Sequence, residues 1–390
     1  MKKILVFCDF YLPSVKSGGG MWTVANLVER FFDRYKFFII TRNYDSPGDT
    51  TPYDSVRTNE WNETFNASVY YADAAELTPK RISELFNEVQ PDCVFMNSVF
   101  STPVVKYLFA RRAGLVRDTP SVIAPCGELS VGALKSKWFK KTVYLTLAKA
   151  RGLYKGLIWK ATTALEVTEI HNAFGRDLQP MIAPDLTPKH ILPNFDLSQK
   201  PPKESDKVRL IFLSRIVPKK NLKYLLELLT TFDKGVVNLD IVGPNEDEAY
   251  WNECADLIAK LPNNVRASIV GTVNYSHGLE LMRESHFFVL PTLNENFGYV
   301  FVESMAAGTP IITSDQTVWS SVEEKNAGWA IPLGDRERWL ATLSKCVEMD
   351  NDDYLAMASS ARALATGWLS DTRHEEATAN VLTAALNSVK

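Results

Sequence analysis

The sequence predicts an α/β protein with two doubly wound domains, each built on a mostly parallel sheet. Short apolar runs that are typical of buried strands alternate with runs of helical periodicity along most of the chain. The alternation is interrupted by the polar segment 196–207, which contains Pro201 and Pro202 and is typical of a linker. A length of 390 residues also exceeds what one hydrophobic core usually supports. We therefore expect one domain on each side of this segment.

The first domain begins with a buried-strand pattern, a loop that carries Pro13 and Gly18–Gly20, and a helical run at 22–32. That run places Val24, Leu27, Val28 and Phe31 on one face, as an amphipathic helix does. A second helical run covers 79–89. The predicted strands, which are short and flanked by Pro or Gly, are 3–8, 37–41, 68–71, 93–96 and 121–124.

The second domain repeats this style after the linker. Its predicted strands are 208–214, 236–242, 267–270, 286–290 and 309–313. Its predicted helices are 222–230, 250–260, 279–283 and 299–306. Ligands of such sheets bind at the carboxyl ends of the strands, so we expect the functional site there, in a cleft between the domains.

Composition excludes several classes of protein. With 46% hydrophobic and 23% charged residues, the chain is neither disordered nor collagen-like nor a coiled coil. The net charge of -3 divides unevenly, because residues 1–200 contain 25 Lys and Arg against 20 Asp and Glu. Five scattered cysteines without a C-x-x-C pair indicate reduced thiols in a cytoplasm. The apolar run Ile4–Phe7 is too short for a signal peptide, and no run approaches the roughly 20 residues of a membrane span.

The most informative segment follows the predicted strand 286–290. Its loop carries Glu295, and Gly298 permits a close backbone approach before a helix begins near Tyr299 and Val300. Backbone N–H groups at a helix N-terminus bind phosphate, and Glu303, eight residues after Glu295, offers a carboxylate to vicinal hydroxyls. A simpler interpretation is that acidic residues near a helix start only complement the helix dipole.

Together with Gly308-Thr309-Pro310, this segment resembles the E-x7-E signature of the retaining, nucleotide-sugar-dependent glycosyltransferases of family four. That family has the GT-B fold, two doubly wound Rossmann-like domains that face each other across a cleft. Further segments resemble family motifs in the second domain. Arg215 and Lys220 resemble the family's paired basic positions, Gly243 resembles the glycine after the next strand, and Ile269–Val273 resembles the nucleobase-side turn. Pro193-Asn194 resembles the motif before the linker, and Gly19-Gly20 resembles the N-terminal loop that faces the donor phosphates. The resemblance implies an acceptor-side domain at 1–196, a donor-binding domain at 207–365, and a helix within 366–390 that returns to the first domain.

The resemblance also implies roles for single residues. Glu303 would hold the ribose hydroxyls, and Glu295 would lie near the transferred sugar, beside the backbone of Phe297 and Gly298. Val273, Tyr299 and Val300 complete the expected donor site. Arg215 and Lys220 would stabilise the charge that develops on the departing diphosphate, because a guanidinium fork and an ammonium suit phosphate oxygens.

We therefore expect a hexosyltransferase that needs neither a metal ion nor a cofactor, with the nucleotide sugar as co-substrate. Asp350-Asn351-Asp352 formally matches an Asp-x-Asp metal motif. It follows a polar, helix-like run rather than a strand, so we interpret it as a surface turn.

Two positions depart from the family pattern. Many relatives carry a histidine in a Pro-His-Gly context where this chain has Pro125-Cys126-Gly127. Cys126 cannot reproduce the hydrogen bonds of an imidazole, so we place Cys126 and Glu128 on the acceptor side and leave the sugar open. Asn221 stands where relatives usually have glycine, and asparagine also tolerates left-handed backbone.

Residues 129–165 contain no acid and many bases, with aromatic residues between them. This composition suits a helix on an anionic membrane surface, with Lys137, Lys140 and Lys141 as the candidate contacts. Nucleic-acid binding would use the same residue types. A long helix with its apolar side in the core and solvated lysines is the third interpretation. The resemblance favours the membrane, because many relatives glycosylate lipid-linked acceptors.

The expected function is sugar transfer from a nucleotide diphosphate-sugar to a saccharide or lipid-linked saccharide. We place it in bacterial surface polysaccharide assembly, such as lipopolysaccharide, O-antigen or capsule, in the cytoplasm or peripherally at the inner face of the membrane. A NAD-dependent oxidoreductase is disfavoured because Gly18–Gly20 lacks the full G-x-G-x-x-G and its later acid. A non-catalytic scaffold that binds nucleotide sugars is disfavoured by the presence of Arg215, Lys220, Glu295 and Glu303 together.

Overall fold

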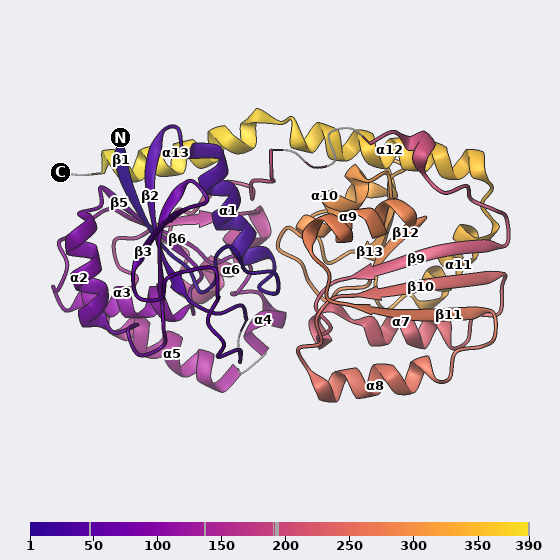
Figure 1. Cartoon of the computed structure of the whole chain (residues 1–390), viewed down its shortest axis with the longest axis horizontal. Helices are drawn as coiled ribbons and strands as arrows, with labels where there is room; N and C mark the ends of the chain where they lie inside the picture. The colour runs from indigo at the N-terminus through magenta and orange to yellow at the C-terminus, as the bar shows by residue number, and fades with distance from the viewer. Residues whose placement is uncertain (47, 136–137, 190, 192–194, 389–390) are drawn as a thin grey trace. The chain divides into compact units, whose positions relative to one another are not determined.

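The structure is a computed structural model that describes residues 1–46, 48–135, 138–189, 191 and 195–388. Its internal contacts divide the chain into two units (Figure 1). The first unit comprises Met1–Lys189 together with Asp371–Lys390, and the second comprises His190–Ser370. Each unit contains a sheet of mainly parallel strands with helices packed on it, so the predicted α/β fold class is confirmed.

In the first unit the strand order is β3-β4-β2-β1-β5-β6-β7-β8. Neighbouring strands pair in parallel, except that β3 and β4 form an antiparallel hairpin. The strands are β1 (Lys2–Phe7), β2 (Tyr35–Arg42), β3 (Trp61–Thr64), β4 (Ala67–Ala72), β5 (Cys93–Asn97), β6 (Ser121–Ala124), β7 (Ile158–Ala161) and β8 (Met181–Ile182). The register is set by apolar residues on both faces of the central strands, for example Ile4 opposite Phe37 and Cys93.

Helices cover both faces of this sheet. They are α1 (Gly19–Phe31), α2 (Pro79–Val89), α3 (Thr102–Arg112), α4 (Val131–Lys135), α5 (Trp138–Ala150), α6 (Ala164–Phe174) and α13 (Thr372–Asn387). Buried residues of α1 and α13 pack in one hydrophobic cluster, and those of α2, α3, α5 and α6 pack in another. Residues from the very end of the chain, including Val381 and Leu382, therefore complete the core of the first unit.

In the second unit the strand order is β11-β10-β9-β12-β13-β14, and all pairs are parallel. The strands are β9 (Lys207–Leu213), β10 (Val236–Val242), β11 (Val265–Gly271), β12 (Phe287–Leu290), β13 (Ile311–Ser314) and β14 (Gly328–Ile331). The helices are α7 (Leu222–Leu229), α8 (Glu248–Ile258), α9 (Tyr275–Glu284), α10 (Tyr299–Ala306), α11 (Arg336–Glu348) and α12 (Asn351–Leu369), with a short 3-10 turn η2 (Pro218–Lys220) before α7.

Each strand and helix range predicted from the sequence falls on an element of the same type, and α2 and α10 have the predicted bounds. Local chemistry explains why α2 was predictable. The Thr78 hydroxyl accepts a hydrogen bond from the Arg81 N–H at 3.1 Å, and Pro79 occupies the first turn. One boundary differs, because α1 begins at Gly19 and not near Trp22, so Gly19 and Gly20 form its first turn rather than a loop.

The segment 196–207 is not a free linker but part of the second unit. The buried Lys200 ammonium donates to the Ser285 carbonyl and the Thr309 hydroxyl, each at 2.7 Å. The buried Lys203 ammonium donates to the Val347 carbonyl at 2.9 Å. Burial lowers the pKa of both lysines. The Ser285 and Val347 carbonyls lie at the C-terminal ends of α9 and α11, where the helix dipole favours a cation.

Two further expectations need correction. Asp350 does not lie in a surface turn, because it caps α12 and accepts a hydrogen bond from the Asp353 N–H at 2.9 Å. The basic stretch 129–165 is not one helix either. It contains α4, α5 and β7, and both Trp159 and Lys160 are buried in β7.

Candidate functional site

The carboxyl ends of the second unit's strands bring several of the predicted residues to one edge of its sheet. In a parallel sheet these ends share an edge, so the loops after β9, β10, β11 and β12 are neighbours. Arg215 follows β9, Val273 follows β11, and Glu295 follows β12. The turn η2 brings Lys220 to the Glu295 loop.

A buried ion pair joins Lys220 to Glu295. The Lys220 ammonium donates to the Glu295 carboxylate, and the two side chains are only 13% and 10% exposed. The Thr292 hydroxyl donates to the same carboxylate at 3.0 Å, and the Leu293 N–H donates to the Lys219 carbonyl at 2.9 Å. Burial alone would raise the pKa of Glu295, but the neighbouring Lys220 and Lys219 cations leave it below its ordinary value. Glu295 is therefore held as a carboxylate.

Burial also lowers the pKa of Lys220, although Glu295 opposes this shift. Among the smaller causes, the cations of Arg215 and Lys219 lower it further, which reflects how close these charges lie. The site thus concentrates positive charge that is only partly compensated. The chain reaches this geometry through Asn221, whose φ of 61° and ψ of 37° are left-handed, the backbone state that the sequence analysis anticipated there.

Arg215 makes a second ion pair that the sequence analysis missed. Its Nη1 lies 3.0 Å from Oε2 of Glu246, in the loop after β10. The two loops touch through their backbones, because the Ile216 N–H donates to the Pro244 carbonyl at 2.8 Å. Gly243 makes this approach possible, since a Cβ there would lie 2.0 Å from the Ser214 carbonyl oxygen. The spacing of Arg215 and Glu246 in the sequence carries no signal of this contact.

The start of α10 is shaped by Gly298, which has a left-handed φ of 78° and provides no side-chain cap for the helix. The backbone around Tyr299 and Val300 therefore starts a helix without the polar side chain that usually occupies this place. The ring of Phe297 points into a buried aromatic cluster with Trp319 and Trp368. Its carbonyl accepts a hydrogen bond from the Trp319 indole at 2.8 Å. Phe297 thus fixes the loop through both its ring and its carbonyl oxygen.

Glu303 lies in the second turn of α10 and is 9% exposed. Burial raises its pKa to about 7, against a hydrogen bond from the Tyr275 hydroxyl that lowers it. Tyr275 begins α9, two residues after Val273, a partly exposed residue of the turn after β11. Glu303 is therefore the acid of this edge that titrates near neutral pH.

The first unit brings together a separate group of predicted residues. The Asn97 side-chain amide donates to the Gly20 carbonyl at 2.8 Å, and the Cys126 thiol donates to Oδ1 of Asn97 at 3.1 Å. Cys126 has a left-handed φ of 53°, and burial raises the pKa of its thiol well above the ordinary value. It is thus held as a neutral thiol, which is a poor nucleophile.

The Glu128 carboxylate is hydrogen-bonded to residues of the first unit. Its carboxylate accepts hydrogen bonds from the Ser98 hydroxyl at 2.8 Å and the Val99 N–H at 2.7 Å, so it orders the loop after β5. The loop after β6 is held similarly, because the buried Glu166 accepts from the Gly127 N–H at 2.6 Å. A buried pair between Lys160 and Asp185, 2.8 Å apart, supports the same region.

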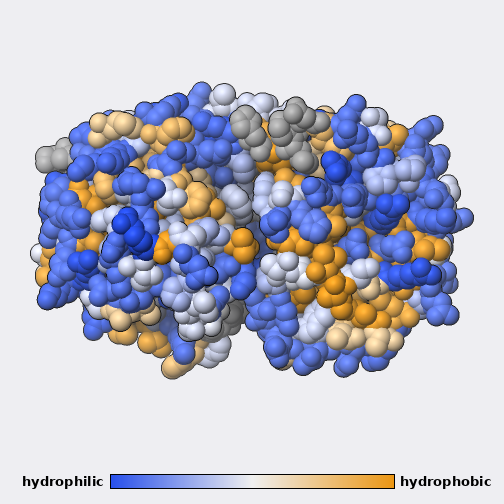
Figure 2. Space-filling model, in the orientation of Figure 1, coloured by the Kyte–Doolittle hydropathy of each residue, from blue (hydrophilic) through white to orange (hydrophobic). Residues whose placement is uncertain are grey.

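Helix α5 carries several exposed apolar residues of the basic stretch. Trp138, Phe139, Val143 and Leu147 are 63%, 65%, 42% and 48% exposed, and the last three repeat every four residues on one face. Figure 2 shows apolar side chains at the lower edge of the first unit, where α5 lies in Figure 1.

The predicted lysines differ in their placement. Lys140 is exposed, whereas Lys141 donates to the Ala133 carbonyl at 2.7 Å. Lys137 lies outside the described residues. No helix within the described part of the chain is long and apolar enough to cross a membrane.

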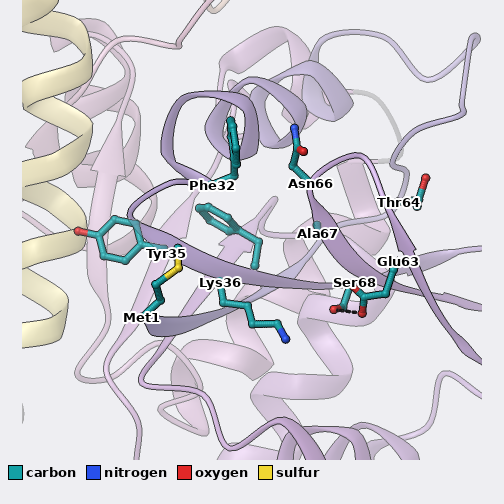
Figure 3. A pocket seen from close by; sticks show the side chains of 10 residues that line it. Met1, Phe32, Tyr35, Lys36, Glu63, Thr64, Asn66, Ala67 and Ser68 are labelled. Carbon is teal, nitrogen blue, oxygen red and sulfur yellow. Dashed lines mark hydrogen bonds between the residues drawn. The ribbon is translucent and has the colours of Figure 1, made fainter.

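A groove of about 340 Å³ lies at the end of the first unit's sheet where β2 and β4 begin (Figure 3). It is lined by the start of β2 at Tyr35, the β3–β4 hairpin around Asn66, and Met1. Because these residues lie at the amino ends of β2 and β4, the groove contains none of the predicted site residues. Across the residues that the structure describes, no cluster of three or more His, Cys, Asp or Glu side chains could hold a metal ion.

Comparison with known families matches residues 194–387 to the glycosyl transferases group 1. This half of the chain is a group 1 glycosyltransferase domain. It contains Arg215, Lys220, Glu295 and Glu303, so the ion pairs described above lie inside the family domain.

The five cysteines of the chain are free thiols.

Curated relatives match part of the chain. This chain is 31% identical over 161 residues to the phosphatidyl-myo-inositol mannosyltransferase of Mycolicibacterium smegmatis. The matched segment covers 40% of this chain and 39% of that protein. The enzyme of the same name from Mycobacterium leprae is 31% identical over 133 residues, 32% of this chain and 33% of that protein. The chain thus matches between a third and two fifths of the length of these relatives.

Solved structures match over nearly the whole chain. The Anabaena protein HepE in complex with UDP and glucose covers 98% of this chain and all of its own, with a TM-score of 0.69 at 18% identity. Sucrose-phosphate synthase from Thermosynechococcus elongatus covers all of both chains, with a TM-score of 0.75 at 16% identity. The chain that carries the group 1 domain therefore has the GT-B fold, with two Rossmann-like units, as the sequence analysis expected.

Proposed function

We propose that the chain is a retaining glycosyltransferase that moves a hexose from a nucleotide diphosphate-sugar to a saccharide or lipid-linked saccharide. The observation that carries the proposal is the buried Lys220–Glu295 pair, with the Arg215 guanidinium close enough to perturb the Lys220 ammonium. Such fixed cations suit the charge of a departing diphosphate. The group 1 domain supports the proposal, as do structural neighbours that were solved with UDP or UDP-glucose.

In the proposed reaction, the bond between the anomeric carbon and the diphosphate oxygen breaks, and its electron pair leaves with the diphosphate. The acceptor hydroxyl forms the new carbon–oxygen bond on the same face of the sugar, and its proton passes to the departing phosphate. Arg215 and Lys220 stabilise the developing negative charge. Glu295 lies beside the transferred sugar, and the carboxylate of Glu303 accepts hydrogen bonds from the ribose hydroxyls.

The same proposal assigns the remaining donor contacts. The backbone N–H groups near Tyr299 and Val300 would bind phosphate at the start of α10, and Val273 would contact the nucleobase. The backbone of Phe297 and Gly298 would lie beside the transferred sugar. The two cations supply charge that a metal ion would otherwise provide, so we expect activity to persist in EDTA. No cofactor takes part, since the nucleotide sugar is a co-substrate.

The first unit would receive the acceptor. Gly19 and Gly20, exposed in the first turn of α1, would face the donor phosphates, and Cys126 would lie beside the sugars with Glu128 supporting its surroundings. A role in bacterial surface polysaccharide assembly fits a saccharide acceptor. We place the protein at the cytoplasmic face of the membrane, and α5 is the surface that would touch lipid.

The proposal is tested by incubating the protein with UDP-, GDP- and ADP-sugars and candidate acceptors, and by reading product masses. Lys220→Ala should lower kcat by about 10²–10³-fold with a smaller change in donor KM, because it removes a charge that acts in the transition state. Arg215→Ala should also lose transfer. Nucleotide-sugar binding without turnover for any acceptor would instead support a scaffold, and NAD binding would support an oxidoreductase. Equal activity of the wild type and both variants would contradict the site.

A further inference from the structure

The loop after β10 places a carboxylate against one of the proposed catalytic cations. Glu246 accepts a hydrogen bond from Nη1 of Arg215 at 3.0 Å, with side-chain exposures of 23% for the acid and 38% for the base. Neither the family match nor the E-x7-E resemblance assigns a role to Glu246. Its ion pair is partly exposed, so the pair alone contributes little to stability.

The backbone fixes this pair in place before any ligand arrives. The Ser214 N–H donates to the Val242 carbonyl at 2.9 Å, and the Ile216 N–H donates to the Pro244 carbonyl at 2.8 Å, on either side of Arg215. Ile216 and Asn245 also form an isolated parallel bridge. On the other side of Glu246, Asp247 caps α8 and accepts from the Tyr250 N–H at 3.0 Å. Both partners thus extend from backbone that is anchored directly beside them.

The contact uses only part of the guanidinium. Arginine has five N–H donors in a planar fork, and Glu246 takes one of them, on Nη1. Within the described residues, this is the side-chain hydrogen bond that Arg215 makes, so Nε and Nη2 remain available to bind two oxygens side by side. Arginine binds phosphate best in this bidentate manner. A carboxylate on Nη1 would therefore orient the fork without occupying the edge that a diphosphate needs.

We propose that Glu246 is a positioning residue, which holds the Arg215 guanidinium so that its Nε and Nη2 face the diphosphate of the donor. This inference rests on the proposed function of the same site. Glu246 itself touches no substrate and acts through Arg215. The opposite role would be competition, in which Glu246 occupies Arg215 and must be displaced by the donor. The two roles predict opposite effects on donor binding.

The experiment compares Glu246→Ala and Glu246→Gln with a matched control, Glu253→Ala. Glu253 forms an ion pair with Lys223 at 2.6 Å, in the same unit and between α7 and α8, and neither residue is part of the proposed site. For each variant, kcat and donor KM are measured with the donor that the screen identifies. The dissociation constant of UDP is measured by calorimetry, and Tm is measured without ligand.

Glu246→Ala should lower kcat by roughly tenfold, because a freed guanidinium no longer meets the leaving group in the productive geometry. Glu246→Gln should stay within about threefold of the wild type, since the Gln amide oxygen can still accept from Nη1. UDP should bind Glu246→Ala more weakly than Glu246→Gln. Glu253→Ala should match the wild type in kcat and KM, and all variants should keep the wild-type Tm within a few degrees.

Three results would overturn the positioning role. Tighter UDP binding by both Glu246 variants would indicate competition. Equal losses in Ala and Gln variants would mean that charge rather than orientation matters, and an unchanged kcat in Glu246→Ala would mean that Arg215 orients itself. A wild type that neither binds UDP nor any other nucleotide, and transfers no sugar, refutes the proposed function instead, so the two failures are distinguishable.

Discussion

A single buried carboxylate gives the candidate site a pH dependence of its own. Glu303 is 9% exposed, and burial raises its pKa to about 7, whereas the Lys220 and Lys219 cations keep Glu295 ionised well below that pH. A protonated Glu303 has only one oxygen left as a strong acceptor for vicinal hydroxyls. The two acids of the E-x7-E segment therefore differ in charge state at neutral pH, a difference that their spacing alone does not reveal.

Nucleotide binding should consequently strengthen as the pH rises through 7. For a group with a pKa near 7, the ionised fraction rises about tenfold between pH 6 and pH 8, so the UDP dissociation constant should fall by up to about that factor. The Glu303→Gln variant, which cannot ionise, should bind more weakly and lose this dependence. Calorimetry across the pH series checks both, and Glu303→Gln also corrects for titration of the UDP phosphate. The same slope in variant and wild type would contradict the assignment of Glu303.

Residue chemistry predicted some of the site and missed the rest for a clear reason. The left-handed backbone at Asn221 follows from what asparagine tolerates, whereas the close approach at Gly243 was not predicted. Glu246 gave no such signal, because its contact with Arg215 depends on two loops meeting across the sheet edge. The sequence predicts a loop at Gly19 and Gly20, although their backbone forms the first turn of α1.

Among the elements, those with strong local signals were predicted and those that depend on tertiary contacts were not. The bounds of α2 follow from Thr78 and Pro79, whereas β7 and β14 are not among the predicted strands. The polar, proline-containing segment 196–207 reads as a linker by composition. It packs because Lys200 finds acceptors at the end of α9 that are distant in sequence.

Helix α5 can be tested as an interaction surface in its own right. Its exposed stripe of Phe139, Val143 and Leu147, beside the exposed Lys140 and in a stretch without acids, suits the surface of an anionic bilayer. The triple change of Phe139, Val143 and Leu147 to serine should abolish most co-sedimentation with vesicles that contain phosphatidylglycerol, and Lys140→Glu should weaken it several-fold. Leu165→Ser, which alters an equally exposed leucine on α6, is the control.

Vesicles of phosphatidylcholine alone should bind poorly in this assay, since the basic residues contribute about 1 kcal/mol each only at an anionic surface. Binding that is unchanged in the triple variant would show that α5 is only a solvated helix over the core. A nucleic-acid surface would instead be favoured if RNA displaced the protein from vesicles and if Lys140→Glu weakened RNA binding as much as vesicle binding.

At the scale of the whole molecule, alternation of strands and helices was enough to predict two doubly wound sheets, because this pattern has few other solutions. The end of the chain is the part that the alternation could not place. Helix α13 follows α12 of the second unit directly, yet its Val381, Leu382 and Ala385 pack in the core cluster of the first unit. The stability of the first unit therefore depends on residues at the end of the group 1 match, which covers 194–387.

Leu382 allows this dependence to be measured. It is 0% exposed, so Leu382→Ala should cost about 2–5 kcal/mol, and the cost should fall on the first unit. Hydrogen exchange should accelerate in β1 and β5, while the exchange rates of β9 and β10 stay unchanged. The protection that UDP gives to the second unit should also stay unchanged. Leu226→Ala, a change of another fully buried leucine in α7, should give the reverse pattern. Equal acceleration in both units for both variants would mean that the two units unfold as one cooperative block, and that α13 does not belong energetically to the first unit alone.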